Sequence, residues 1–438
     1  MENTDRVLIV GGGIGGLTAA IALAREGIRV HVFEKVPDLQ EVGAGVSLWP
    51  NAMRVFEELG MGKVVKGERA HLERILLLRT DGTPLRRMEG PGRHSEPAIC
   101  LHRADLQNVL AREVPRECLH LGRRAVDFVE DGNRIRVLFQ DGSEEKGILL
   151  VGCDGIHSMT RARMHGTEAP RYRGYEIWRG VTDLELPEEL LGQATEWWGP
   201  GRRFGILPGE PGRVYWYATR SGPRPPESRR TDGPVRNGAP EQGAPRNESP
   251  EHGAPEDERP EHGAPESEAV ETENGTDENS ENGLRRLRAA FDGWPFPAPQ
   301  IIAKVGDAAV LTPAMDRPVP RRWGRGRVTL LGDAAHPMTP NMGQGSCSAV
   351  EDALVLARCV AKEGPGPVAL RRYEDLREKR TRWIVRNSRR VGAVGQLRHP
   401  LLVAVRDRLL PLLPDVALEW GQDRIYGYRA NEATGRTS

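Results

Sequence analysis

The chain has 438 residues, and its 62 lysine and arginine residues balance 62 aspartate and glutamate residues. This length exceeds what one small hydrophobic core organises, so two domains are expected, and the zero net charge removes the electrostatic basis for a nucleic-acid partner. The five cysteines are scattered and form no C-x-x-C pair, so neither a disulfide framework nor a metal site is indicated, and a cytoplasmic location is expected. The N-terminal apolar run is too short for a signal peptide, and no transmembrane segment is expected.

Residues 6–35 predict a strand, a glycine-rich turn, a helix and a second strand that ends on Glu34. The turn contains the pattern G-x-G-x-x-G at Gly11, Gly13 and Gly16. In a dinucleotide-binding fold these glycines permit a tight turn, a close approach of the pyrophosphate, and close packing of the helix against the strand. The N-terminus of the helix then offers free N–H groups to the diphosphate. The pattern therefore predicts a bound dinucleotide.

Glu34 narrows the identity of that dinucleotide. Its carboxylate can accept hydrogen bonds from the ribose hydroxyls but repels a 2′-phosphate, which leaves NAD or FAD as the tightly bound ligand. The sequence contains no dehydrogenase signature and no second dinucleotide fingerprint. If the bound dinucleotide is FAD, a nicotinamide cofactor is expected to bind only transiently.

The middle of the chain changes character twice. Stretches at about 71–99 and 171–220 alternate apolar and polar residues, which predicts a second, antiparallel sheet. Residues 221–283 carry the quasi-repeat EHGAPEDERP and EHGAPESEAV and few large apolar side chains. Such a segment buries too little apolar area to offset its ordering entropy, so it is predicted to be a disordered insertion.

The stretch GDAAHPMTPNMGQG at 332–345 follows an apolar strand and opens a helix. Together with GAGVSLWPNAMRVFEELG at 43–60, LHRADLQ at 101–107 and CDGIHSMTR at 153–161, it resembles the class A FAD-dependent monooxygenases of the p-hydroxybenzoate and salicylate hydroxylase type. Urate hydroxylase-like and zeaxanthin epoxidase-like members are the closest in character. The resemblance runs through the chain in order, apart from 221–283.

The resemblance implies an α/β fold with a Rossmann-type FAD-binding domain, an interleaved antiparallel β-sheet substrate domain, C-terminal helices and one disordered insertion. The FAD-binding domain is expected to comprise residues 1–70, 100–170 and 305–365, and the substrate domain 71–99, 171–220 and 284–304. The insertion is expected at 221–283 and the C-terminal helical region at 366–438.

The resemblance further implies that FAD is held tightly and non-covalently by residues from every motif. Asp333 is expected to bind the ribityl chain, Pro337 to lie beside the isoalloxazine ring, and Asp154 to lie near the diphosphate and the transient NAD(P)H site, on a turn that Ser158 and Arg161 support. The residues expected to contact FAD are Gly11, Gly13, Ile14, Gly15, Gly16, Glu34, Lys35, Val46, Ser47, Arg103, Gln107, Asp154, Gly332, Asp333, Pro337, Gly343, Gln344 and Gly345.

The implied reaction is insertion of one oxygen atom of O₂ into an aromatic, heteroaromatic or electron-rich alkene small molecule. NAD(P)H would reduce the flavin, and O₂ would add to give a C4a-hydroperoxide. Because the cofactor carries this chemistry, no acid–base pair or nucleophile is assigned and no metal is expected. A reductase or dehydrogenase of the same fold, acting without oxygen insertion, is the alternative, and a non-catalytic binding protein would lack flavin.

Several features are left with two interpretations. Arg203 and Tyr215 match the positions of the substrate arginine and tyrosine of urate hydroxylases, but alternation along an antiparallel sheet would also produce them as ordinary core and rim residues. Cys347 leaves the substrate class open, and His336 is expected to be a neutral turn histidine rather than a proton-transfer group. Residues 399–415 could contact a membrane surface, although packing in the core is expected. The protein could be a monomer or a dimer.

Overall fold

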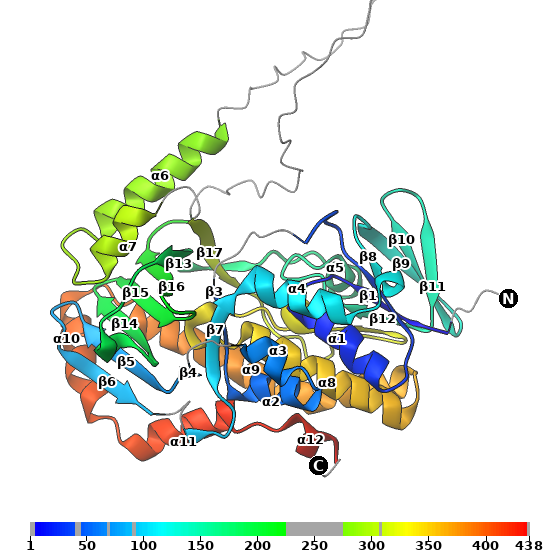
Figure 1. The fold of residues 1–438 in the computed structure, drawn as a ribbon. Helices are drawn as coiled ribbons and strands as arrows, with labels where there is room; N and C mark the ends of the chain where they lie inside the picture. Colours follow the sequence, from blue (N-terminus) through cyan, green and yellow to red (C-terminus); the bar gives the residue numbers. More distant parts are fainter. Residues whose placement is uncertain are drawn as a thin grey trace, which may run out of the picture.

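The computed structural model describes residues 5–39, 45–67, 71–89, 93–224, 275–305 and 309–435. A parallel five-stranded sheet forms the centre of the dinucleotide-binding part (Figure 1). Its strands are, in spatial order, β18 (Val328–Leu330), β12 (Leu149–Gly152), β1 (Val7–Val10), β2 (Val30–Phe33) and β8 (Leu119–His120). All four neighbouring pairs are parallel, which is the arrangement that the strand, glycine turn and helix of residues 6–35 predicted.

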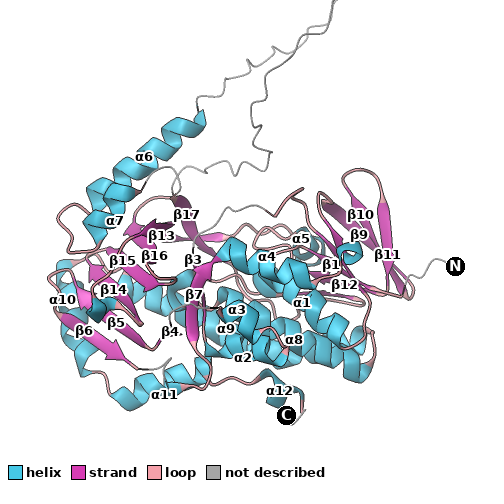
Figure 2. Cartoon of the chain, in the orientation of Figure 1, coloured by secondary structure: helices cyan, strands magenta, loops and turns pink. Residues whose placement is uncertain are grey.

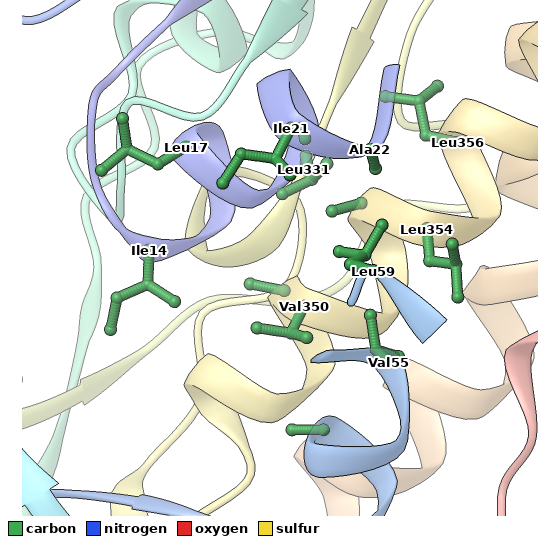
Figure 3. Close-up of a cluster of buried hydrophobic side chains, with 14 of the residues drawn as sticks. Ile14, Leu17, Ile21, Ala22, Val55, Leu59, Leu331, Val350, Leu354 and Leu356 are labelled. Carbon is green, nitrogen blue, oxygen red and sulfur yellow. The ribbon is translucent and has the colours of Figure 1, made fainter. Parts of the chain in front are cut away.

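The two faces of β1 enter two different hydrophobic cores because successive side chains of a strand point to opposite sides. Val7 and Ile9 pack with α1 (Ile14–Arg25) and α8 (Gly345–Glu363), whose apolar contacts are drawn in Figure 3. Leu8 and Val10 pack against an antiparallel sheet of β11 (Glu144–Gly147), β10 (Arg134–Phe139) and β9 (Ala125–Asp131). Coverage on both sides accounts for the continuous apolar sequence of β1.

A smaller sheet lies between the parallel sheet and the substrate part of the molecule (Figure 2). The sheet has the order β3 (Gly45–Leu48), β7 (Ala98–His102) and β4 (His71–Leu72). The helices of this first half of the chain are α2 (Pro50–Glu58), α3 (Gly62–Lys66), α4 (Arg103–Glu113) and α5 (Met159–His165).

A seven-stranded sheet forms the other half of the molecule. Its order is β17 (Val310–Asp316), β13 (Arg171–Asp183), β16 (Arg213–Ser221), β15 (Arg202–Pro208), β14 (Gln193–Gly199), β5 (Arg74–Arg79) and β6 (Pro84–Met88). Every neighbouring pair is antiparallel except β14 and β5, which are parallel. One face packs against α6 (Gly275–Ala290) and α7 (Ala298–Lys304) around Trp178, Trp197 and Trp216, which explains the concentration of tryptophans in this region.

Two segment boundaries differ from those expected. β17 lies in the range 305–365 that the sequence assigns to the FAD-binding domain, but it pairs with β13 and so completes the seven-stranded sheet. The insertion expected at 221–283 is shorter in the structure, because β16 extends to Ser221 and α6 begins at Gly275. The remaining stretch, 225–274, lies outside the described residues.

The C-terminal region is helical, with α9 (Pro367–Gly395), α10 (Pro400–Leu409), α11 (Asp415–Tyr426) and α12 (Ala430–Thr434). The long helix α9 packs on α8 and reaches the seven-stranded sheet, where Arg389 forms an ion pair with the buried Asp316 of β17. Beyond α9, the backbone N–H of Gly201 donates to Leu397 O over 2.7 Å. This region therefore joins the two halves of the molecule.

The apolar stretch 399–415 was expected to pack in the core, and the structure contradicts this expectation. Arg406 is buried and lies over the ring of Trp198, so α10 contacts the protein through this cationic side chain. The apolar side chains of α10 and the segment after it are exposed: Leu401, Leu402, Val405, Leu409, Leu412, Leu413 and Val416. Among the described helices, none is long and apolar enough to cross a membrane.

Candidate active site

The glycine fingerprint forms a turn that leaves no room for side chains at two of its positions. Gly11 has φ +107°, and a Cβ atom there would collide with the backbone of Cys153 at the end of β12. A Cβ atom on Gly16 would collide with the carbonyl of Gly11. By contrast, a Cβ atom on Gly13 would meet nothing within 4 Å. Two glycines therefore close the turn, whereas Gly13 faces open space.

Glu34 and Gln107 converge on the same residue of this turn. Glu34 Oε2 accepts a hydrogen bond from Gly12 N at 2.6 Å, and Gln107 Nε2 donates to Gly12 O at 2.8 Å. Gln107 lies one turn after Arg103, the exposed first residue of α4. Lys35, directly after Glu34, is exposed. The structure thus brings Glu34 and the LHRADLQ segment against the fingerprint turn.

The N-termini of α1 and α8 both lack a side-chain cap. Gly13, which precedes α1, has no side chain to cap the helix, and the side chain of Gln344, which precedes α8, accepts no hydrogen bond from its helix. The two helices pack closely, since a Cβ atom on Gly15 would lie 2.9 Å from Leu331 Cδ2 and 3.1 Å from Ala349 Cβ. The buried Ile14 belongs to the same apolar core. Each helix therefore presents unpaired N–H groups and the positive end of its dipole.

The turn that begins at Gly332 is held by an arginine from another motif. Arg161 is buried, and its Nη1 donates to the carbonyls of Ala334 and Ala335 at 3.0 Å each. Desolvation by burial lowers the pKa of Arg161 to about 10. Arg161 is itself placed by the N-cap of α5, because Ser158 Oγ accepts a hydrogen bond from Arg161 N at 2.8 Å. Ser158 therefore bonds within the Asp154 turn as expected, whereas the guanidinium of Arg161 holds the Gly332 turn rather than the Asp154 turn.

Asp154 and Asp333 are the two carboxylates of these turns. Asp154 Oδ1 accepts from Ser158 Oγ at 2.5 Å, and its Oδ2 accepts from Thr160 N at 2.9 Å, so Asp154 caps the start of α5. Asp333 remains accessible to solvent and lies beside the start of α8, where a Cβ atom on Gly345 would be 4.0 Å from its Oδ1. Desolvation raises the pKa of both carboxyl groups; the hydrogen bonds oppose this at Asp154, and His336 and Arg103 oppose it at Asp333.

The strand β3 lies against the turn that opens α8. Val46 and Ser47 pair with β7 in β3, and Gly343 adopts the left-handed conformation with φ +60°. A Cβ atom on Gly343 would collide with the side chains of Trp49 and Ser47, so glycine is required on steric as well as conformational grounds. Pro337 is buried and accepts from Arg317 N through its carbonyl at 3.5 Å.

Cys347, in the first turn of α8, is buried beside the same strand. Its Sγ lies 3.6 Å from Ser47 O and 3.7 Å from Gly343 O. Burial raises the pKa of this thiol to about 12. The thiol is therefore neutral at physiological pH and is not an activated nucleophile.

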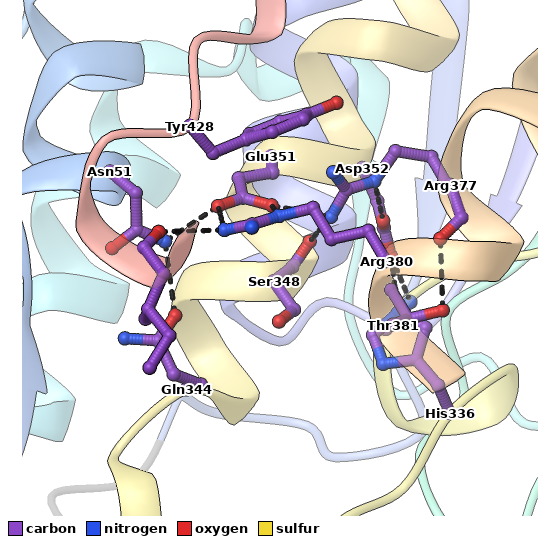
Figure 4. Close-up of polar contacts among 12 residues, drawn as sticks. Asn51, His336, Gln344, Ser348, Glu351, Asp352, Arg377, Arg380, Thr381 and Tyr428 are labelled. Atoms are coloured by element: carbon purple, nitrogen blue, oxygen red, sulfur yellow. Dashed lines mark hydrogen bonds and ion pairs between the residues drawn. The ribbon is translucent and has the colours of Figure 1, made fainter. Parts of the chain in front are cut away.

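A buried polar network links α8 to α2, to α9 and to the turn that begins at Gly332 (Figure 4). Arg377 is fully buried and forms ion pairs at 2.6 Å with both Glu351 and Asp352. Asp352 also lies 2.6 Å from His336 Nε2 and accepts from Gly332 N at 3.1 Å. Although desolvation acts to raise it, the pKa of Asp352 is lowered by His336 and Arg377. The carboxylate that orders the Gly332 turn is therefore ionised.

The same network extends to α2 and to α11. Asn51 Nδ2 donates to Glu351 Oε1 at 2.6 Å and to Gln344 Oε1 at 3.0 Å, which positions the residue before α8. Arg380 pairs with Glu351 at 2.7 Å and donates to the carbonyls of Arg424 and Ile425 in α11. None of these contacts follows from the motifs. The adjacent Glu351 and Asp352 within the apolar sequence of α8 are the signal that could have indicated them, whereas Arg377 is one of many charged residues of α9.

The seven-stranded sheet places the two substrate candidates on protein partners. Arg203 is buried, with Nη1 3.2 Å from Glu196 Oε1 and Nη2 2.5 Å from Asn341 Oδ1. Tyr215 is buried, and its hydroxyl donates to Glu210 Oε2 at 2.9 Å. Both residues are engaged within the protein, which is the arrangement that ordinary core residues of this sheet would have.

The parallel sheet with its glycine fingerprint, two uncapped helices and a separate antiparallel sheet defines a two-part flavoprotein of the class A monooxygenase type. The chain belongs to the FAD binding domain family, whose model matches residues 4–217 and 301–388. It is 37% identical over 418 residues to an aurachin C monooxygenase/isomerase of Stigmatella aurantiaca, covering 94% of this chain and 95% of the relative. It is 30% identical over 410 residues to an FAD-dependent urate hydroxylase of Klebsiella pneumoniae, covering 88% and 89%.

A solved structure of Klebsiella pneumoniae HpxO, complexed with FAD and uric acid, superposes with a TM-score of 0.77 at 27% identity and covers 97% of both chains. These relatives are FAD-dependent monooxygenases and hydroxylases, and the protein is an FAD-dependent monooxygenase. The expected α/β fold and the expected FAD cofactor are confirmed.

Proposed function

We propose that the protein is an NAD(P)H-consuming hydroxylase or epoxidase that inserts one oxygen atom of O₂ into an aromatic, heteroaromatic or electron-rich alkene small molecule. The convergence of the uncapped N-termini of α1 and α8 on the turns of Asp154 and Asp333 carries this proposal. Two helix dipoles aimed at one ligand favour a diphosphate at one end and a negatively charged reduced ring at the other.

The residues present fit FAD. Gly13 offers open space for the diphosphate, and Glu34 lies beside the fingerprint turn, where it can accept from the adenosine ribose. We propose that Arg103 and Gln107 approach the diphosphate from α4, and that Asp333 accepts from the ribityl hydroxyls. We propose that the other expected FAD contacts, which belong to the same motifs, also line the cofactor.

The isoalloxazine ring would then lie alongside β3 and the start of α8. A Cβ atom on Gly343 would collide with Trp49 Nε1 and lie 2.8 Å from Ser47 Oγ, so the turn packs directly on β3 and the ring would border this contact. Bound flavin would supply the oxygen chemistry, which the family resemblance implies would pass through a C4a-hydroperoxide. The chain contributes the ring's position, the helix dipole at its pyrimidine edge and the exclusion of water by the seven-stranded sheet.

The experiment follows oxygen into a product. Purified protein with bound FAD is screened with ring compounds of the types named for its relatives, and NAD(P)H oxidation and oxygen uptake are recorded together. With a true substrate we expect both rates to rise, and turnover under ¹⁸O₂ should give a product with one ¹⁸O atom. Substrate consumption without oxygen in the product would instead establish a dehydrogenase or reductase of the same fold.

A further inference from the structure

Arg179 is a positive charge without a protein counter-ion on the seven-stranded sheet. Its Nη1 donates to Thr312 Oγ1 at 3.3 Å, which is its hydrogen bond in the described part of the chain. No Asp or Glu of the described residues lies within ion-pair distance of it. The side chain is half-buried. Desolvation lowers the pKa of Arg179; Tyr175 opposes this shift, and Arg103 adds to it. An uncompensated charge in such surroundings is costly unless a ligand balances it.

Several arginines of the same sheet are paired with carboxylates, and Arg202, which has no ion pair among the described residues, donates to Ala290 O and lies over the ring of Trp294. Arg203 is paired with Glu196 at 3.2 Å, and Arg220 is paired with Glu176 at 2.7 Å. The protein therefore balances charge on this sheet with a carboxylate at each of these positions. At Arg179 no carboxylate of the described residues takes this role.

The position of Arg179 indicates which molecule would balance its charge. Along β13, Tyr175, Ile177 and Arg179 alternate with Trp178, whose side chain lies in the core under α6 and α7. Tyr175 on the same face accepts a hydrogen bond from Asn341 Nδ2 at 2.9 Å, and Asn341 belongs to the turn that leads into α8. Arg179 thus lies on the face of the sheet that meets the FAD-binding part.

We propose that Arg179 is the anion-binding residue of the substrate site, and that the substrate is a ring compound whose ionised oxygen pairs with this guanidinium. This inference rests on the proposed function. It also assigns Arg203, whose charge Glu196 already balances, to structure rather than to recognition. The guanidinium can pair with a ring oxyanion through one oxygen or with a carboxylate through two.

An ionised ring oxygen serves the proposed reaction directly. When a ring hydroxyl loses its proton to solvent, the remaining oxyanion donates electron density into the ring. Transfer of an electrophilic oxygen atom needs an electron-rich ring carbon. Arg179 would favour the oxyanion over the neutral hydroxyl by placing a fixed positive charge beside it in a partly desolvated site.

The test compares Arg179→Met, Arg179→Lys and the control Arg203→Met, each as the full chain with FAD bound. Binding is followed by the change in flavin absorbance on titration with 3-hydroxybenzoate, 3-methoxybenzoate, 6-hydroxynicotinate and urate, without NAD(P)H. We expect the wild type to bind at least one ionised probe, with a Kd raised tenfold or more by Arg179→Met and partly restored by Arg179→Lys. A hydroxyl-specific site prefers 3-hydroxybenzoate to its methoxy analogue, whereas a carboxylate-specific site binds both.

A second readout separates recognition from a structural role. Removing an uncompensated, desolvated charge should leave the melting temperature of Arg179→Met equal to or above that of the wild type, with full FAD content. Loss of FAD from this variant, a lowered melting temperature, unchanged Kd values, or a wild type that binds none of the anionic probes would overturn the proposal. Because binding is measured without turnover, an enzyme that binds anions through Arg179 but incorporates no oxygen would refute the proposed function alone.

Discussion

Gly13 and Gly16 belong to one fingerprint, yet the structure predicts opposite consequences for side chains at the two positions. Gly13→Val places a side chain in open space, on a backbone with φ −75° and ψ −178° that any residue adopts. Only the weaker N-cap preference of valine acts on the protein itself, at a cost of about 1 kcal/mol. Gly16→Ala instead drives a methyl group into the carbonyl of Gly11, which is backbone and cannot rotate away.

The two variants therefore separate cofactor binding from folding. Gly16→Ala requires α1 to move from β1, and overpacking of this kind costs roughly 1–3 kcal/mol, so the melting temperature of the apoprotein should fall by several degrees. Gly13→Val should change the melting temperature little. Because the valine side chain occupies the approach of the diphosphate, the Kd for FAD should rise at least 100-fold, which corresponds to a loss of roughly 2.7 kcal/mol of binding free energy. Differential scanning fluorimetry of apoprotein and titration with FAD measure both quantities. Wild-type FAD affinity in Gly13→Val would refute the placement of the diphosphate.

Three further perturbations test other parts of the structure. Arg377→Met leaves buried Glu351 and Asp352 with less compensation and should destabilise the protein by roughly 3–5 kcal/mol, with loss of FAD on dialysis, whereas melting curves of the exposed control Arg322→Met should match the wild type. Deleting 225–274 should leave the melting temperature within about 2 °C, because its composition offers little area to bury; a large fall would contradict this. The pKa of His31 is lowered from 6.5 to about 4, first by desolvation and then by Arg6 and His120. Between these two pH values the unfolded chain therefore binds more protons than the folded protein. Stability should therefore fall as pH drops from about 6.5 to 4, and His31→Gln should flatten that fall in melting temperature, whereas parallel curves would show that His31 does not titrate in this way.

The sequence predicted those parts of the fold whose signals are local. The fingerprint, its flanking strands and the opening of α8 each depend on glycine conformation and hydrophobic periodicity within about 30 residues. Pairing of β17 with β13 could not be predicted in this way, because a short alternating strand carries no information about its partner. The same holds for the exposure of Leu401 and Leu412, since apolar periodicity indicates a helix face but not what covers it.

The residues of the candidate site differ in the same way: local sequence patterns predicted some of them, and others depend on long-range contacts. Positions that require glycine, such as Gly11 and Gly343, were visible as motifs, and the structure gives a steric reason for each. Compensation of charge was not visible: Arg203 and Arg179 lie on β15 and β13, which β16 separates in one sheet. Only three-dimensional pairing shows that Glu196 balances Arg203, whereas no carboxylate of the described residues pairs with Arg179. The choice of substrate-binding arginine therefore depends on neighbours across strands, and the spacing of residues in the sequence does not predict those neighbours.

The hydrogen bonds from α9 and α2 to residues 424–428 also bear on when during synthesis the cofactor can be held. Arg380 binds the carbonyls of Arg424 and Ile425, and Arg54 binds those of Tyr426 and Tyr428. The glycine fingerprint at residues 11–16 is synthesised before these residues and can fold early with its neighbouring strands. The contacts that hold α8, however, are complete only when residues 424–428 have been synthesised. Flavin is therefore expected to be captured late, and a chain that stops before Arg424 should fold in large part yet hold its cofactor poorly.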